Sequence, residues 1–338
     1  MMKNPRAKHN FVGRPCSITG VGSYVPEKIL TNADLEKMVE TSDEWITTRT
    51  GIKERRIAAA DEFTSDLATK AALRAMEMAG VTADQLDLII VASITPDMPF
   101  PNTACLVQQK LGARRVPAFD IEAACSGFLY ALEVGQNFIT ARTFETVLVI
   151  GAEKLSSITN WKDRNTCVLF GDGAGAAILQ NRPLSHGLLT TALGADGSKA
   201  ELLSMPGGGS RCPATPQTVQ DGLHFLRMDG KETFKNAVQA MCSAATEVLG
   251  RCEIDITKIK CIIPHQANRR IVDAVGERLG ATPEQLFVNL HKYGNTSAAS
   301  VAIALDEAVR SGRVVRGDLI LIVAFGAGLT WGAAIIEW

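Results

Sequence analysis

The segment VPAFDIEAACSGFLYA, residues 116–131, places a cysteine where it could act as a nucleophile. The apolar run Val116–Ile121 predicts a short strand, and the small residues after it predict a turn into a helix that begins at Cys125 and runs to about Arg142. That helix is apolar nearly all round, so we expect it to be buried. A thiol in the first turn of a helix faces the positive end of the helix dipole, which favours the reactive thiolate. Cys125 is therefore a candidate nucleophile, with a buried structural cysteine as the alternative.

Two further residues could act on a carbonyl group. His265 follows an apolar strand and a proline in IIPHQAN, and open α/β sheets place their chemistry at such carboxyl ends of strands. Asn295, in YGNTS, would by itself be a turn residue or a helix cap. A structural role is the alternative for both. The other nearby imidazole, His291, precedes the turn, and we expect it to point away from the site.

The sequence GDGAGA at residues 171–176 matches a dinucleotide-binding fingerprint. The residues after it form only a short apolar run that stops by Pro183, so no helix is available to hold a pyrophosphate at its N-terminus. We interpret these glycines as a tight turn between two strands. Trp45 and Arg49 lie four residues apart, on one face of a predicted helix that Ser42 caps. They predict either a binding surface or ordinary packing beside a surface charge.

The predicted elements occur in one order twice. In the first half, hydrophobic patterning predicts strands at Ser17–Tyr24, Leu86–Ser93, Val116–Ile121 and Thr146–Ile150. It also predicts four helices: Asn32–Val39, one that begins at Ser42, Thr64–Ala79 and one that ends at Leu111. In the second half, the same patterning predicts three helices: Ala237–Leu249, one that ends at Leu279 and Ser297–Val309. It predicts strands at Ile259–Ile263, Leu286–Leu290 and Leu319–Ala324, and a further strand that forms a hairpin with the last of these.

This repetition predicts a duplicated fold. A strand, an elbow, a buried helix, a strand, a glycine turn and a strand occur around Cys125 and again around Asn295. Two such units packed together would bring both elbows near one pseudo-twofold centre. We expect a loose tail at residues 1–16, an N-terminal half at 17–183 and a C-terminal half at 184–338. Residues 195–222, rich in Gly, Pro and Ser, are long for a loop and predict a flexible functional segment, such as a lid or tunnel wall.

Composition narrows the class of protein. The chain has 338 residues, a net charge of −1 and 21% charged residues, so nothing favours nucleic acid or a membrane surface as a partner. The eight cysteines include no C-x-x-C pair, which argues against a structural zinc site. With no signal peptide, we expect reduced cysteines and a cytoplasmic location. The apolar stretch Leu319–Ile336 is broken by glycines and predicts a buried hairpin rather than a membrane span.

Six separated motifs together resemble one family. AACSGFLYAL at Cys125, PHQAN at His265, YGNTSAAS at Asn295 and GAGLTWG near the C-terminus are similar to β-ketoacyl-acyl-carrier-protein synthase III, and SDEWITTRTGI and FGDGAGAAIL agree with it. The resemblance runs in register over residues 17–338. It implies an α/β thiolase-like fold with duplicated halves in a five-layered αβαβα arrangement, usually as a homodimer. It also implies decarboxylating condensation of an acyl-CoA primer, such as acetyl-CoA, with malonyl-acyl carrier protein, the step that initiates fatty-acid biosynthesis.

The resemblance also assigns roles to residues. Cys125 would carry the acyl group, and the backbone N–H groups of Cys125 and Ala327 would form an oxyanion hole, although many relatives have glycine at position 327. His265 Nε2–H and the Asn295 amide would stabilise the enolate left by decarboxylation, with Phe325 as an apolar wall beside them. CoA would be the substrate's leaving group, and no cofactor or metal is expected.

Other implied roles concern binding. Trp45 and Arg164 would hold the CoA adenine between them by stacking and cation–π contact. The pantetheine tunnel and the nucleotide phosphates would be contacted by Thr41, Arg49, Phe234 and Asn268. Lys235 and Arg270 would dock the acidic carrier protein, with ordinary surface charge as the alternative. Phe100 would cross the dimer interface to close the partner's acyl pocket.

Three alternatives to this reading differ in chemistry. The first is a related synthase with another primer, from a biotin pathway or as a starter enzyme of a secondary pathway, and the residues that line the acyl pocket would decide between primers. The second is a cysteine-dependent thioesterase, against which His265 with Asn295 argues because hydrolysis needs a general base for water. The third is an inactive acyl-binding scaffold, which the presence of the cysteine, histidine and asparagine makes unfavourable.

Overall fold

A computed structural model describes residues 16–182 and 187–338 of the chain. The expected tail therefore lies outside the described residues apart from Cys16, and so does the expected boundary between residues 183 and 184.

The first half forms a five-stranded sheet in the order β1-β7-β6-β4-β5. Strands β4, β5 and β6 run parallel to one another and are joined by helices, as parallel strands require. Strand β7 pairs antiparallel with β6, and β1 pairs antiparallel with β7. The strand bounds are β1 Ser17–Tyr24, β4 Leu88–Ala92, β5 Ala118–Ile121, β6 Thr146–Glu153 and β7 Gly173–Gln180. Three of these strands, β4, β6 and β7, are almost wholly buried, as their continuous apolar runs require.

The second half repeats this topology in a four-stranded sheet, β11-β12-β13-β8. Its strands are β8 Gly187–Ala195, β11 Cys261–Pro264, β12 Leu319–Gly326 and β13 Thr330–Glu337. Strands β11 and β12 are parallel, and β13 and β8 are antiparallel, so the order and directions match β4, β6, β7 and β1. The final hairpin predicted from the glycine-broken apolar stretch is confirmed.

The predicted strand Leu286–Leu290 is wrong. Leu286 makes a single bridge to Ile262, at the place that β5 occupies in the first sheet. Beyond it, the backbone N–H groups of Asn289 and Leu290 donate to the side-chain oxygen of Gln266 rather than to a neighbouring strand. An apolar run alone does not show where its backbone groups find partners.

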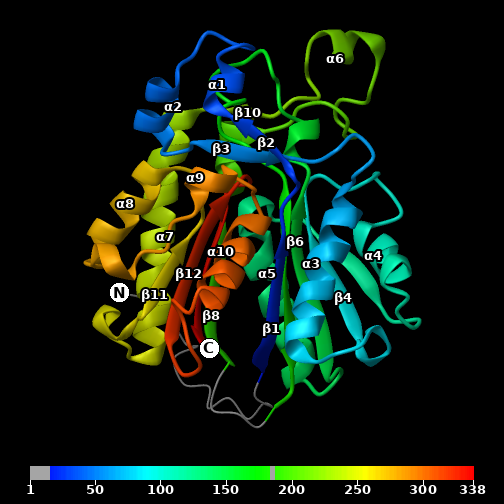
Figure 1. The fold of residues 1–338 in the computed structure, drawn as a ribbon, viewed down its shortest axis with the longest axis vertical. Helices are drawn as coiled ribbons and strands as arrows, with labels where there is room; N and C mark the ends of the chain where they lie inside the picture. The colour runs from blue at the N-terminus through cyan, green and yellow to red at the C-terminus, as the bar shows by residue number, and fades with distance from the viewer. Residues whose placement is uncertain (1–15, 183–186) are drawn as a thin grey trace.

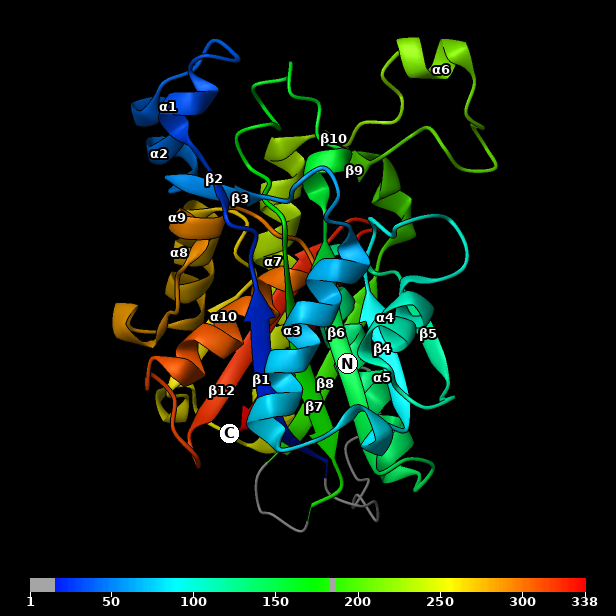
Figure 2. The same ribbon diagram turned by 45° about the vertical axis from the view of Figure 1, so that its right-hand side comes forward.

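The helices divide the molecule into five layers (Figures 1 and 2). In the middle, α5 (Gly127–Thr140) and α10 (Ala299–Arg310) lie between the two sheets and share one core with them. Helices α3 (Thr64–Ala79) and α4 (Thr103–Leu111) pack on the outer face of the first sheet. Helices α7 (Gly230–Cys252) and α8 (Arg269–Leu279) cover the outer face of the second sheet. The predicted αβαβα arrangement is confirmed.

Smaller elements gather over one end of the sheets (Figure 1). They are the ribbon β2 (Lys28–Thr31) with β3 (Glu54–Ile57), the ribbon β9 (Leu203–Ser204) with β10 (Arg227–Met228), and the helices α1 (Asn32–Leu35), α2 (Asp43–Thr50), α6 (Pro216–Gln220) and α9 (Leu290–Tyr293). The Gly- and Pro-rich stretch 195–222 thus contains a short 3-10 helix, η4 (Gly197–Leu202), one strand of a ribbon and α6. In Figure 2, α6 stands apart from the layered core.

The glycines of GDGAGA do not form a tight turn, so that interpretation is wrong. Strand β6 ends at Glu153, and Gly173 and Gly175 lie within β7. A Cβ added to Gly175 would lie 2.5 Å from the Ala302 Cβ of α10. These glycines therefore let α10 approach the sheet closely. Because β7 is a strand, no helix follows the motif, as expected.

Candidate functional site

A cavity of about 1260 Å³ lies where the carboxyl ends of the parallel strands of both sheets meet the smaller elements. Ten of the fourteen predicted site residues line it: Trp45, Arg49, Cys125, Phe234, His265, Asn268, Arg270, Asn295, Phe325 and Ala327. Thr41, Phe100, Arg164 and Lys235 are not among the lining residues. Part of the long stretch predicted as a lid or wall, around Leu203 to Gly209, also lines this cavity.

The elbow that presents Cys125 is held by contacts with the second sheet. Ala124, just before the cysteine, has φ of 44°, a left-handed conformation that side chains rarely adopt. The Ser126 hydroxyl lies 2.8 Å from the Ala123 carbonyl oxygen and 2.8 Å from the Thr330 hydroxyl of β13. The strand-to-helix turn is therefore fixed by a residue more than 200 positions away.

The end of β12 passes directly beside the nucleophile. A Cβ added to Gly326 would lie 2.5 Å from the backbone nitrogen of Cys125, so only glycine permits this approach. The residues on either side of Gly326 both line the cavity: the Phe325 side chain is buried, and Ala327 lies at the cavity wall. The backbone N–H groups of Cys125 and Ala327 thus belong to two segments that meet at one point, as an oxyanion hole requires.

His265 is fixed from two sides and is neutral near pH 7. Its backbone N–H donates to Val323 of β12 at 2.8 Å, and its Nδ1 lies 2.6 Å from the Ser300 hydroxyl on α10. Burial lowers the pKa of the imidazole to about 4. A Ser300 hydroxyl that donates to Nδ1 leaves the proton of the neutral ring on Nε2, the tautomer needed for a donor.

Hydrogen bonds to two segments of the chain fix the backbone and the side chain of Asn295. Its backbone N–H donates to the Leu169 carbonyl at 2.8 Å, and its carbonyl accepts from Gly171 at 3.0 Å. Its side-chain oxygen accepts from the Ser297 backbone N–H at 2.8 Å, which turns the –NH₂ group the other way. Since a hydrogen-bonded oxygen fixes which end of a carboxamide is the donor, Asn295 can present N–H to a ligand.

Burial opposes the thiolate that the helix terminus would favour at Cys125. Burial raises the pKa of the thiol to about 12, the Ser297 hydroxyl lowers it, and the neighbouring Glu153 carboxylate raises it again. Cys125 lies in a short 3-10 turn, Ala124–Ser126, that leads into α5 at Gly127, and not in the first turn of the helix as predicted. Its removal from water opposes the pull of the helix terminus. A nucleophilic role of this thiol would therefore require it to lose its proton as it reacts.

At the mouth of the cavity, two arginines surround one tryptophan. The guanidinium carbon of Arg49 lies 4.7 Å from the Trp45 ring centre, which confirms that the two share a helix face. The guanidinium carbon of Arg164 lies 5.2 Å from the same ring, and its Nη1 donates to the Glu40 carbonyl at 2.9 Å. Because Arg164 rests on the ring itself, a base could enter between them only after Arg164 swings away.

Asn268 has structural partners in addition to its place at the cavity wall. Its side-chain oxygen caps α8 by accepting from the Arg270 backbone N–H at 2.9 Å, and its –NH₂ group donates to the Arg49 carbonyl at 3.1 Å. Arg270 and Lys235 are both exposed, on α8 and α7 respectively, and Arg270 is the one that lines the cavity. The Thr41 hydroxyl is buried without a hydrogen-bond partner.

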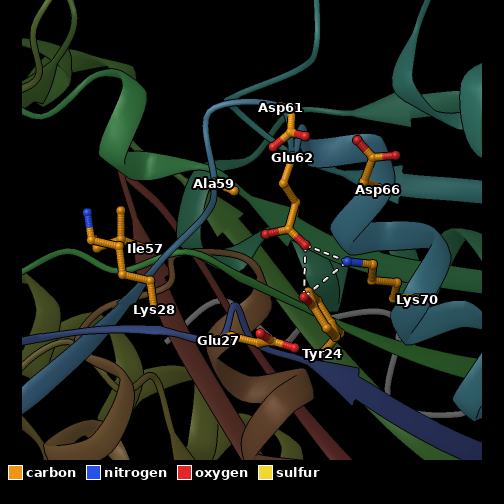
Figure 3. Close-up of a pocket in the computed structure, with 9 residues that line it drawn as sticks. All are labelled: Tyr24, Glu27, Lys28, Ile57, Ala59, Asp61, Glu62, Asp66 and Lys70. Atoms are coloured by element: carbon orange, nitrogen blue, oxygen red, sulfur yellow. Dashed lines mark hydrogen bonds and ion pairs between the residues drawn. The ribbon is translucent and has the colours of Figure 1, made fainter.

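A second hollow, of about 700 Å³, lies on the surface beside the start of α3 (Figure 3). In it, the Lys70 ammonium donates to the Glu62 carboxylate at 2.6 Å and to the Tyr24 hydroxyl at 3.0 Å. The Tyr24 hydroxyl in turn donates to Glu62 at 2.8 Å. These groups satisfy one another, so we place the functional site in the larger cavity.

Three residues near the nucleophile were not predicted from the sequence. They are Glu153 at the end of β6, Ser297 in the elbow before α10, and Ser300, which contacts His265. A signal existed for one of them, because a carboxylate directly ending the buried run TVLVIGA is unusual unless it has partners. The two serines gave no such signal, since serine is common beside helix termini.

Family models and relatives agree with this site. The model described as 3-oxoacyl-[acyl-carrier-protein] synthase III matches residues 119–197, and the model of the C-terminal part of the same synthase matches residues 249–338. A β-ketoacyl-[acyl-carrier-protein] synthase III of Caldanaerobacter subterraneus subsp. tengcongensis is 60% identical over 95% of this chain and 97% of its own length. The chain belongs to this synthase III family.

Solved structures support the same assignment. The synthase III of Aquifex aeolicus is 50% identical over 96% of this chain and all of its own, with a TM-score of 0.90. The priming β-ketosynthase of the R1128 polyketide pathway is 35% identical, covers 96% of each chain and has a TM-score of 0.89. The predicted thiolase-like fold is therefore confirmed, and the chain is an acyl-transferring condensing enzyme.

Across residues 16–182 and 187–338, no helix is long and apolar enough to span a bilayer. Within the same ranges, no cluster of three or more His, Cys, Asp or Glu side chains is suited to hold a metal ion. All eight cysteines lie in the described part and are free thiols.

Proposed function

We propose that this protein condenses an acyl-CoA primer with malonyl-acyl carrier protein, releasing CoA and CO₂ and forming 3-oxoacyl-acyl carrier protein. The observation that carries the proposal is the convergence of Cys125, His265 and Asn295, from both halves of the fold, on one cavity. Family membership supports the reaction class, since the relatives are named for this synthesis.

In the first half-reaction, Cys125 attacks the thioester of the primer and takes the acyl group from CoA. The backbone N–H groups of Cys125 and Ala327 would hold the developing oxyanion, because the close approach at Gly326 brings the two segments together. CoA would lie along the channel that begins at Trp45 and Arg49, with Phe234 and Asn268 at its wall. Arg164 would close on the adenine after opening, and Thr41 would offer its buried hydroxyl near the same mouth.

In the second half-reaction, the malonyl thioester loses CO₂ and the resulting enolate attacks the acyl-Cys125 carbonyl. His265 Nε2–H and the Asn295 –NH₂ group would donate to the enolate oxygen. Both are neutral, which suits a site that must admit a carboxylate and then release it as CO₂. The buried ring of Phe325 would favour that loss by excluding water from the carboxylate.

We propose acetyl-CoA as the primer and initiation of fatty-acid biosynthesis as the role. The likeness to a priming polyketide synthase favours one alternative, a starter enzyme with a different primer. A biotin-pathway synthase with a dicarboxyl primer and a cysteine-dependent thioesterase are the other outcomes that the experiment below distinguishes. No metal or cofactor has a part in this chemistry.

We also propose a cytoplasmic homodimer that docks the carrier protein beside the cavity mouth. Strand β5 is an edge of the first sheet, and the segment before α4 exposes 84% of Phe100 and 43% of Met98. Large exposed apolar side chains beside a free sheet edge favour contact with a second chain. Lys235 and Arg270 supply positive charge for an acidic carrier protein.

The test follows the acyl group by mass. The protein is incubated with acetyl-CoA, longer acyl-CoAs or a dicarboxyl-CoA, its intact mass is recorded, and malonyl-acyl carrier protein is then added. We expect an acetyl adduct on Cys125 that is consumed with release of CO₂, and no adduct on a Cys125→Ala variant. Hydrolysis of the adduct without condensation would support the thioesterase instead. An adduct formed only from the dicarboxyl primer would move the protein to the biotin pathway.

A further inference from the structure

Glu153 is a fully buried carboxylate beside the reactive sulfur, and the mechanism above does not use it. It ends β6, and the loop after β4 surrounds its carboxylate. The Ile94 backbone N–H donates to it at 3.2 Å, the Ser93 hydroxyl at 3.3 Å, and the Thr95 hydroxyl donates as well. Ser93 and Ile94 themselves line the cavity, so Glu153 lies directly behind the cavity wall.

Ser297 belongs to the elbow before α10, and this elbow packs against the end of β6 and the start of α5. A Cβ added to Gly151 would lie 2.4 Å from the Ala298 carbonyl oxygen, and one added to Gly127 would lie 3.6 Å from the Ala298 Cβ. Ser297 lines the same cavity as Cys125. It is 1% exposed and has φ of 48°, a strained left-handed conformation that fixes where its side chain points. Its hydroxyl is buried without a hydrogen-bond partner, and it lowers the pKa of both Cys125 and Glu153. A buried hydroxyl left without a partner calls for an explanation, and a hydroxyl can accept one hydrogen bond and donate another at the same time.

The reaction needs a proton carrier at this place. The Cys125 thiol must lose its proton during acylation, and the Cys125 sulfur becomes a leaving group during condensation. His265 is a poor candidate for this task because its Nδ1 contacts Ser300 and its Nε2–H is the proposed donor to the enolate. Lys154, the residue after Glu153, is not a candidate either, since its ammonium donates to the Ala59 and Glu62 carbonyls.

We propose that Glu153 and Ser297 form a proton relay that takes the proton of Cys125 during acylation and returns it after condensation. This inference rests on the proposed acyl-Cys125 intermediate. In acylation, the Cys125 S–H bond breaks as sulfur attacks the thioester carbon, its proton passes to the Ser297 oxygen, and the Ser297 proton passes to the Glu153 carboxylate. The C–S bond to CoA then breaks, and the departing CoA thiolate takes a proton from water.

Condensation reverses the relay. The enolate carbon, formed with loss of CO₂, bonds to the acyl carbon, and the C–S bond to Cys125 breaks. The sulfur regains a proton from Ser297, which regains one from the Glu153 carboxylic acid. Glu153 ends as the carboxylate with which it began, so each cycle takes up one proton from water, the one that CoA carries away.

The energetics of Glu153 suit this task. Burial raises the pKa of its carboxyl to about 7, whereas hydrogen bonds from Thr95, Ser297, Ile94 and Ser93 act in the opposite direction. A group with a pKa near the working pH can both accept and give up a proton. Cys125 is the titratable group whose charge interacts with it.

The experiment measures single-turnover acylation by acetyl-CoA from pH 5.5 to 9, with intact mass as the readout. We expect Glu153→Gln and Ser297→Gly each to slow acylation roughly a hundredfold, the usual contribution of acid–base catalysis, and to remove the inflection near pH 7. Glycine at position 297 removes the hydroxyl and suits the left-handed backbone. The matched control is Asp172→Asn, another buried carboxylate, which accepts from Ala58 and Ser156 away from the cavity and should keep the wild-type pH profile.

A parallel measurement separates this inference from the proposed function. Alkylation of Cys125 by iodoacetamide also requires loss of the thiol proton but needs no acyl-CoA, and peptide mapping assigns it among the eight cysteines. Folded Glu153→Gln and Ser297→Gly proteins that acylate and alkylate with the wild-type rate and pH profile would overturn the relay. If Glu153→Gln does not fold, as judged by thermal melting, Ser297→Gly decides. A wild-type protein that does not acylate contradicts the proposed function, and the alkylation rates then test the relay alone.

Discussion

His265 and Asn295 reach the cavity as two neutral donors whose orientation other residues fix. Ser300 contacts the histidine ring at Nδ1, and the Ser297 backbone N–H holds the side-chain oxygen of Asn295. Donors that are already oriented cost no reorganisation when negative charge develops on a bound oxygen, which is why such groups contribute strongly to catalysis.

This arrangement predicts a selective defect. Replacing His265 or Asn295 by alanine should slow decarboxylation of malonyl-acyl carrier protein roughly a hundredfold or more, because one oriented hydrogen bond to the enolate is lost. Acylation of Cys125 should persist, since neither residue takes part in it. Measurement of CO₂ release beside intact mass separates the two steps.

The matched control for the histidine is His291→Ala, because that imidazole is exposed on α9 and lies outside the cavity lining. It should decarboxylate like the wild type. Equal losses of acylation and decarboxylation in the His265 and Asn295 variants would contradict the assigned roles.

The burial of His265 also predicts how stability depends on pH. Its pKa is lowered to about 4 in the folded protein, so the unfolded chain binds the proton first as pH falls below about 6.5. Stability from this residue is therefore complete above pH 6.5 and lost as pH falls toward 4, by about 3 kcal/mol at most. We expect urea unfolding to show that the difference in free energy of unfolding between the wild type and His265→Gln shrinks from pH 6.5 to pH 4. A difference that stays constant over this range would contradict a lowered pKa of His265.

At the scale of elements, glycines decide how closely helices approach the sheets. Gly326 admits the end of β12 to the Cys125 backbone, and Gly175 admits α10 to β7. The two buried helices α5 and α10 can share one thin middle layer only because such positions carry no side chain.

Gly175→Ala should therefore destabilise the protein. The added methyl would lie 2.5 Å from the Ala302 Cβ and 2.7 Å from its backbone carbon, so α10 would have to shift. Overpacking of this kind costs about 1–3 kcal/mol, which chemical denaturation would measure.

The control for this change is Gly250→Ala, at an exposed position of α7 with open space around it. Alanine there should stabilise the protein by about 0.5–1 kcal/mol, because glycine is a poor helix former. A Gly175→Ala variant with the stability of the wild type would contradict the close packing of α10 on β7.

At the scale of the molecule, duplication places the site between two similar halves. Each half supplies a sheet whose parallel strands end at the cavity, so Cys125 comes from one half and His265 with Asn295 from the other. Neither half could hold the reaction alone. The second expected level of assembly, a homodimer, is a proposal supported by the exposed apolar segment beside β5.

Phe100→Asp should weaken that dimer. A charge at a side chain that is 84% exposed costs the monomer little, but it would be costly if a partner buries the ring. Light scattering after size exclusion at micromolar concentration should show a shift toward monomer. Val315→Asp, at another exposed apolar position, should leave the oligomeric state unchanged, and an unshifted Phe100→Asp protein would argue against this interface.

Local patterns in the sequence were enough to predict the kind of chemistry and most of the helices and strands. The helix Thr64–Ala79 and the strand Ser17–Tyr24 are found with the predicted bounds, because each depends on a local pattern of apolar residues. The duplicated order of elements and the six motifs were sufficient to predict the family and the layered fold. Motif chemistry is local too, which is why Cys125, His265 and Asn295 could be selected before any coordinates.

Properties that depend on contacts between distant residues could not be predicted from the sequence and became visible in the folded chain. The raised pKa of the Cys125 thiol, the contact of the His265 ring with Ser300 and the raised pKa of Glu153 all arise from burial and from partners far away in the chain. The glycines of β7 were misinterpreted for the same reason, since the helix that they accommodate lies more than 120 residues later. Burial and long-range packing set pKa values and close approaches, and neither is present in a local pattern.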